Sequence, residues 1–134
     1  MWGKDDKRVP VNRTGRFGRI DINHFLTEGI AFANIYYGDI EPAFTKGYKY
    51  GIRRYYAKPG TAYPAPDKWG AISALAWGLS RAMDCFETDT HIDSKKVALF
   101  GVSRLGETVL WAGAHDTPFR GCCKAAGVCF VTPY

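Results

Sequence analysis

The chain has 134 residues, 46% of them hydrophobic and 15% aromatic, which is the composition of one small globular domain and excludes a disordered segment. The net charge is +5, but the basic residues are scattered and accompany no nucleic-acid-binding motif, so we expect no nucleic-acid partner. No apolar stretch approaches the roughly 20 residues of a membrane span, and residues 1–8 lack the apolar core of a signal peptide.

The first half of the chain predicts one short helix, one strand and a long loop. Residues 1–15 are polar, and we expect them to be loosely ordered ahead of a domain over residues 16–134. Apolar positions within residues 18–28 suit a short helix. The apolar run over residues 30–36 predicts a buried strand. Residues 38–68 are rich in Tyr, Gly and Pro, and a loop of that length is usually functional or mobile.

The tyrosines of this predicted loop leave two interpretations open. Their rings line a sugar-binding site, or they pack the loop against the rest of the domain, which is the role we prefer. The aromatic residues concerned include Tyr48, Tyr50, Tyr55, Tyr56 and Tyr63.

The second half of the chain alternates helices and strands. Apolar residues recur at intervals of three and four over residues 69–87, which predicts an amphipathic helix. A strand over 97–100, a helix over 104–115 and a strand over 121–131 follow. With the strand predicted at 30–36, this order indicates the α/β class, a parallel sheet joined by right-handed crossover helices.

The cysteines give no indication of a metal or redox site. Their spacing matches no Cys-x-x-Cys pattern, so we expect no metal and no cofactor. Three of the four lie in the last predicted strand, where a free thiol is a common small hydrophobic group. The four are Cys85, Cys122, Cys123 and Cys129.

A Gly-x-Ser-x-x-Gly sequence, residues 101–106, stands between a predicted strand and a predicted helix. This order is typical of a nucleophile elbow, in which a strained turn exposes a serine hydroxyl, here that of Ser103. Glycines flank the serine because so tight a turn leaves no space for side chains. A helix N-terminus also favours developing negative charge. The alternative is that Ser103 only caps the helix.

Three separated segments agree in order with one family: Tyr-Tyr-Gly-Asp within residues 36–42, the helix at 69–84, and the elbow with its helix at 101–114. From about Arg16 to Phe119 the chain resembles the glucuronoyl esterases of carbohydrate esterase family 15, especially the bacterial members. The resemblance implies a three-layer α/β-hydrolase fold with a parallel sheet and flanking helices. It also implies hydrolysis of the ester between 4-O-methylglucuronic acid on xylan and lignin alcohols.

The resemblance implies roles for two residues of the elbow. Ser103 matches the nucleophile, and Arg104 matches the arginine that helps to stabilise the oxyanion. Donors fixed where charge develops lower the barrier to acyl transfer. Glu107 stands where the family commonly has a sugar-contacting lysine, so its charge is reversed at a predicted substrate-binding position. Asp39 is a second candidate for substrate binding, although a role in anchoring its loop is favoured.

The sequence provides no complete triad. His115 is the only histidine after Ser103, and twelve helical residues place it about 18 Å away. The resemblance implies that the acid and the base come from later parts of the fold. We therefore expect an incomplete, central portion of the domain, with open sheet edges that promote self-association and little activity on its own. The family is typically secreted or periplasmic.

Three functional hypotheses follow. The first is the glucuronoyl-esterase-like serine hydrolase, acting on glucuronoxylan or lignin–carbohydrate esters. The second is a non-catalytic segment that binds carbohydrate or a partner through the tyrosine-rich loop. The third is a serine hydrolase of acetyl or other acyl esters, which Glu107 keeps open.

Overall fold

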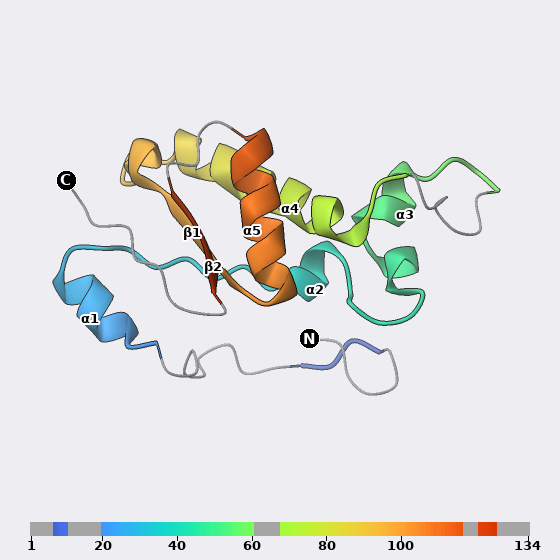
Figure 1. The fold of residues 1–134 in the computed structure, drawn as a ribbon, viewed down its shortest axis with the longest axis horizontal. Coiled ribbons are helices and arrows are strands. Elements are labelled where there is room, and N and C mark those ends of the chain that lie inside the picture. The colour runs from blue at the N-terminus through green and yellow to red at the C-terminus, as the bar shows by residue number, and fades with distance from the viewer. Residues whose placement is uncertain (1–6, 11–19, 61–67, 117–120, 126–134) are drawn as a thin grey trace.

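The computed structural model describes residues 7–10, 20–60 and 68–116, together with the backbone of residues 121–125. Figure 1 shows how these segments are arranged. The helices and strands are α1 (Ile22–Thr27), α2 (Tyr37–Ile40), the 3-10 turn η1 (Gly47–Tyr50), α3 (Ile52–Tyr56), α4 (Ala71–Thr88), the 3-10 turn η2 (Ser94–Lys96), β1 (Ala98–Val102), α5 (Arg104–His115) and β2 (Gly121–Ala125).

Strands β1 and β2 form a parallel pair, and α5 connects them. The register pairs Ala98 with Gly121 and Val102 with Ala125. Parallel strands need a crossover connection, and α5 provides it by packing on both strands. Helix α4 packs against α5, which crosses it in Figure 1. The two strands and α5 thus form one βαβ unit, whose crossover helix is covered by α4.

The core lies between α4, α5 and β1. Ala76, Met83 and Ala112 are buried together, and they are flanked by partly buried apolar side chains from α4 and from the start of β1. The α4 members of this cluster, at positions 76, 79, 83 and 86, recur at intervals of three and four residues, which explains why this sequence forms a long amphipathic helix. The flanking residues are Leu79, Phe86, Val97 and Leu99.

Met83 carries the largest fully buried side chain among the described residues, with an exposed fraction of 1%. Truncation to alanine leaves a cavity, so Met83→Ala is expected to lower the free energy of unfolding by about 2–5 kcal/mol. Urea unfolding followed by circular dichroism measures this loss. Cys85 lies on the same helix and is exposed, so Cys85→Ala is a matched control with an expected change within about 0.5 kcal/mol. Equal losses in the two variants would contradict the assigned core.

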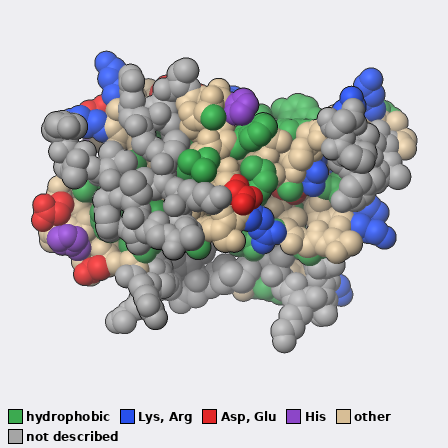
Figure 2. All heavy atoms as spheres, in the orientation of Figure 1, with side chains coloured by type: hydrophobic (Ala, Val, Ile, Leu, Met, Phe, Trp, Pro, Cys, Tyr) green, Lys and Arg blue, Asp and Glu red, His purple; other side chains and the backbone are tan. Residues whose placement is uncertain are grey.

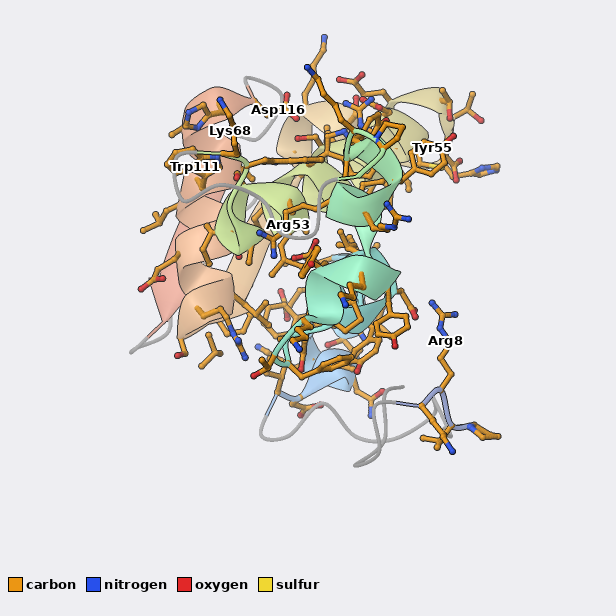
Figure 3. All side chains as sticks on the ribbon, turned by 90° about the vertical axis from the view of Figure 1, so that its right-hand side faces the viewer. Arg8, Arg53, Tyr55, Lys68, Trp111 and Asp116 are labelled. Atoms are coloured by element: carbon orange, nitrogen blue, oxygen red, sulfur yellow. The ribbon has the colours of Figure 1, made fainter. Side chains whose placement is uncertain are left out.

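A buried ion pair organises the segment between α2 and α4. Glu41 is 2% exposed, and both of its carboxylate oxygens accept hydrogen bonds from Arg53 Nε at 2.8 and 2.9 Å. A terminal guanidinium nitrogen of Arg53 donates to the Trp69 carbonyl at 3.2 Å. The guanidinium carbon lies 5.9 Å from the centroid of the buried Tyr48 ring. Figure 3 shows Arg53 between α3 and α4, with Tyr55 on the opposite side of α3.

Within residues 20–116, the structure confirms four predicted elements and corrects two. It confirms the helices α1, α4 and α5 and the strand β1, with ends shifted by a few residues. The strand predicted over residues 30–36 is wrong, because these residues form no regular structure and most are exposed. The loop predicted over residues 38–68 is wrong in part, because α2, η1 and α3 lie within or across it.

The remaining predictions on the fold concern the ends of the chain. The last predicted strand is confirmed over Gly121–Ala125, and residues 126–131 lie outside the described residues. Of residues 1–15, only 7–10 are described. Two parallel strands, instead of the three expected, are present in the part of the chain that the structure describes. In the same part, no helix combines the length and apolar character needed to cross a bilayer.

Candidate functional site

Ser103 joins β1 directly to α5 in a backbone conformation that is strained for serine. Its φ of 57° and ψ of −126° lie in a region where residues other than glycine are rarely found. The turn brings β1 so close to α5 that a Cβ at Gly101 would overlap the Leu105 carbonyl group. The Ser103 carbonyl accepts hydrogen bonds from Gly106 N–H at 2.8 Å and Glu107 N–H at 3.2 Å. Strand, strained serine and helix therefore follow without an intervening residue.

The hydroxyl of Ser103 does not serve as a helix cap. Within the described residues, the Ser103 side chain makes no capping hydrogen bond, and the residue is exposed. The simple N-cap interpretation of this serine is therefore wrong. An exposed hydroxyl on a strained turn at a helix N-terminus is the arrangement that a nucleophile elbow requires.

Arg104 opens α5 and extends its side chain towards α2. The guanidinium carbon lies 6.0 Å from the centroid of the Tyr37 ring, within the range of a cation–π interaction. The Arg104 carbonyl accepts a hydrogen bond from Thr108 Oγ1 at 3.1 Å. The first turn of α5 thus holds the backbone of Arg104, and α2 contacts its charged end.

Glu107 shares the first turn of α5 with Arg104, three residues further along, and both are exposed. Residues at this spacing are neighbours on one side of a helix. Figure 2 shows acidic and basic side chains next to each other near the place where α5 begins beside α2. The structure therefore brings together three of the four predicted site residues, Ser103, Arg104 and Glu107.

Asp39 belongs to a different surface. It is exposed on α2, two positions after Tyr37, so the two side chains leave this short helix on nearly opposite sides. Asp39 lines an open groove of about 370 Å³ between α2, the segment from η1 to α3, and α4. The other lining residues include Tyr50, Tyr55, Trp77 and Arg81. Neither Ser103 nor Arg104 lines this groove.

A second open groove, of about 410 Å³, lies between α4 and the far end of α5. Its lining residues include Trp69, Trp77, Trp111 and Asp116, and Figure 3 labels the last two at the end of α5. Tyr56, Trp69 and Trp77 contact one another edge to face, at centroid distances of 5.7 to 6.4 Å. Such contacts are typical of rings that pack a structure together.

The histidines of the described part lie away from Ser103. His115 ends α5, where its ring stacks on Trp111 at 4.4 Å, about 18 Å from Ser103 by the rise of the helix. His91 lies before β1, and its Nδ1 is 3.1 Å from Asp89 Oδ1. Because Ser103 follows the other end of β1, the length of the strand separates His91 from the elbow. His24 lies on α1 against Phe25. No group of three metal-ligating side chains gathers among the described residues.

Sequence reasoning did not predict the contact between Tyr37 and Arg104. The Tyr-Tyr-Gly-Asp segment indicated a family and gave no spatial partner for either tyrosine. The structure places that segment beside the elbow, and the Tyr37 ring lies against the guanidinium group of Arg104, the residue that follows Ser103. A contact between residues so far apart in the chain leaves no local pattern in the sequence.

The strand–turn–helix unit, with α4 packed on the crossover helix, has the arrangement of the central part of an α/β-hydrolase fold. Residues 10–120 match the protein family described as "Glucuronyl esterase, fungi". The chain belongs to the glucuronyl esterase family, as the resemblance in its sequence predicted.

Individual relatives agree with this assignment. The chain is 53% identical to "Carbohydrate esterase MZ0003" from an unknown prokaryotic organism, over 85% of this chain and 26% of that protein. It is 32% identical to a 4-O-methyl-glucuronoyl methylesterase of Hypocrea jecorina, over 66% of this chain and 18% of that protein. The solved glucuronoyl esterase from Solibacter usitatus superimposes with a TM-score of 0.80 at 44% identity, over 89% of this chain and 31% of that one. The chain thus spans 26% and 18% of the length of these two curated relatives.

Proposed function

We propose that this chain carries the nucleophile segment of a serine-dependent carboxylic ester hydrolase that acts on glucuronoyl esters of xylan. The observation that supports the proposal is the strained backbone of Ser103, which exposes its hydroxyl at the junction of β1 and α5. Strain of this kind costs about 1–3 kcal/mol and is concentrated at functional sites. A serine with only a structural role would have no reason to keep such a conformation.

In the proposed reaction, Ser103 Oγ attacks the ester carbonyl and its proton passes to a general base. Negative charge develops on the carbonyl oxygen, and Arg104 stabilises it from the first turn of α5. The ester C–O bond breaks as the base returns this proton to the departing alcohol, and water then hydrolyses the acyl-enzyme to restore Ser103. The histidines of the described part lie too far away to act as the base, so other residues must supply it.

The substrate class rests on the relatives, two of which are named as esterases of glucuronoyl esters. Glu107 and Asp39 are both proposed substrate-binding residues, but they lie on different surfaces. Glu107 shares the helix turn of Arg104 and can accept hydrogen bonds from sugar hydroxyls, whereas a lysine in its place would donate them. Asp39 lines the groove beside α3, so we assign it to contacts further along the saccharide or to anchoring α2.

Labelling with a fluorophosphonate ester tests the nucleophile directly. When residues 10–120 replace the matching segment of the Solibacter usitatus esterase, so that the rest of the domain supplies a base, the protein is expected to gain one phosphonyl group, and peptide mapping is expected to place it on Ser103. Ser73, Ser80 and Ser94 provide internal controls, because each lies in a helix or 3-10 turn without backbone strain. Modification spread over several serines, or the same labelling of Ser103→Ala, would contradict the proposal.

Turnover by the chain alone is expected to be slow. Without a placed base, catalysis depends on binding and on oxyanion stabilisation. An assay with a glucuronate alkyl ester should therefore give a rate close to that of Ser103→Ala. A rate far above this control would show that the chain possesses a base that the geometry does not reveal.

A chimera separates the esterase hypotheses. Residues 10–120 replace the matching segment of the Solibacter usitatus esterase, which is 44% identical, so that the rest of the domain is supplied. Methyl glucuronate is expected to be hydrolysed faster than a sugar acetate. The reverse order would favour the acetyl-ester hypothesis, to which Glu107 points.

A non-catalytic carbohydrate-binding role is the second candidate, favoured by the exposed Tyr55, which is 81% exposed beside the groove of Asp39. It predicts that xylo-oligosaccharide binding, measured by calorimetry, survives Ser103→Ala. Changes at Tyr55, Tyr56 or Trp69 would weaken that binding. No binding by the parent chain would remove this candidate.

A further inference from the structure

We infer that Tyr37 is a positioning residue for the oxyanion arginine. Its ring holds the Arg104 guanidinium beside the elbow. This inference rests on the proposed function, because it assigns a partner to the residue that stabilises the oxyanion there. It also assigns a role in the reaction to the Tyr-Tyr-Gly-Asp segment, which lies outside the elbow.

The first step concerns the freedom of the Arg104 side chain. Arg104 is exposed, and a long arginine side chain loses rotamer entropy when it is fixed in place. Electrostatic stabilisation is effective only when the charged group is already placed where charge develops. The Tyr37 ring, 6.0 Å from the guanidinium carbon, attracts the cation and restricts its positions.

The second step concerns what fixes the Tyr37 ring. The Tyr36 ring packs against it at a centroid distance of 5.1 Å and an interplanar angle of 49°. Tyr36 also covers Gly38, where an added Cβ would lie 2.6 to 2.8 Å from atoms of the Tyr36 ring. Only glycine at position 38 lets Tyr36 occupy this place. The consecutive residues Tyr36, Tyr37 and Gly38 therefore form one packed unit.

The third step concerns how this unit is held relative to α5. Ile40, at the end of α2, fits against Gly78 of α4, where an added Cβ would overlap the Ile40 side chain. The next residue, Glu41, is fixed by its buried ion pair with Arg53. Helix α4 also packs against α5, so both sides of the contact between Tyr37 and Arg104 are anchored to the same helix. Figure 1 shows α2 beside the beginning of α5.

The rate at which Ser103 is acylated by 4-nitrophenyl acetate tests the inference in the chimera described above, in which the rest of the domain supplies the base. Release of 4-nitrophenolate gives the rate, and intact mass confirms one acetyl group. Arg104→Ala is expected to slow acylation by about 10- to 100-fold. Tyr37→Leu is expected to slow it by about 2- to 5-fold, because a cation–π contact at an exposed site is modest. Tyr37→Phe keeps the ring and is expected to retain the parent rate.

The double variant distinguishes positioning from a general structural role. If Tyr37 acts through Arg104, then Tyr37→Leu has no effect in a chain that already carries Arg104→Ala. Equal slowing in both backgrounds would overturn the inference and leave the proposed function intact. No slowing by Tyr37→Leu in the parent chain would also overturn it. An unchanged rate in Arg104→Ala, with acylation abolished in Ser103→Ala, would refute the role of Arg104 and the inference with it.

A measurement that does not require activity covers the case in which Tyr37→Leu fails to fold. The Tyr37 ring is expected to shift the side-chain NMR resonances of Arg104 in the parent chain. The shift is expected to remain in Tyr37→Phe and to be absent in Tyr37→Met, which retains an apolar side chain of similar length. Arg104 resonances at random-coil positions in the folded parent chain would overturn the inference.

Discussion

Ser103→Ala is expected to lower kcat on methyl glucuronate by about 10⁶ in the chimera that supplies the rest of the domain. The loss is large because nucleophile, base and acid act as a unit, so removing the first makes the others ineffective. Steady-state hydrolysis measures it, and circular dichroism establishes that the variant is folded.

A second serine provides the matched control for this prediction. Ser80 lies on α4, where its hydroxyl donates to the Ala76 carbonyl, and its backbone is helical. Ser80→Ala is expected to retain the parent rate and to change the free energy of unfolding by no more than about 1 kcal/mol. If Ser103→Ala retained more than about one hundredth of the parent activity, a role for Ser103 as the nucleophile would be untenable.

Arg53→Ala is expected to lower the free energy of unfolding by about 3–5 kcal/mol, a large fraction of what a small domain possesses. The variant leaves the Glu41 carboxylate buried without its partner, since Glu41 is 2% and Arg53 only 13% exposed. The Trp69 carbonyl loses a donor as well. Urea unfolding at constant pH measures the change.

Two further variants show whether the loss arises from the unpaired charge. Glu41→Leu combined with Arg53→Met removes both charges and is expected to be much less destabilising than Arg53→Ala alone. Arg54 is the exposed neighbour of Arg53 on α3, so Arg54→Ala is expected to change stability by no more than about 0.5 kcal/mol. Comparable losses for Arg53→Ala and Arg54→Ala would contradict the role of the buried pair.

The elements that the sequence predicts correctly are those with a local cause. The apolar periodicity of α4 persists over five turns, and the glycines around Ser103 are needed by a turn only a few residues long. The strand predicted over residues 30–36 fails because an apolar run contains no information about a hydrogen-bonding partner. A strand exists only when its backbone groups are paired, and these residues have no strand beside them in the described part.

The candidate site likewise contains some features with a local cause and others that depend on distant residues. Ser103, Arg104 and Glu107 lie within five residues at the start of α5, so their proximity follows from the sequence itself. Asp39 and Tyr37 are also close in the chain, yet they face opposite sides of α2, and only Tyr37 reaches the elbow. Which side faces Arg104 is decided by Ile40 against Gly78 and by the Glu41–Arg53 pair, and these are long-range contacts.

The conformation of Ser103 makes its chemistry depend on the integrity of the whole fold. A serine in a free peptide would leave the region around φ 57° at once, and only the packing of β1 and α5 on either side keeps it there. Reactivity at Ser103 is therefore a property of the folded population alone. A reagent that labels this serine also reports folding, and its rate should decline through a urea titration in parallel with the native fraction.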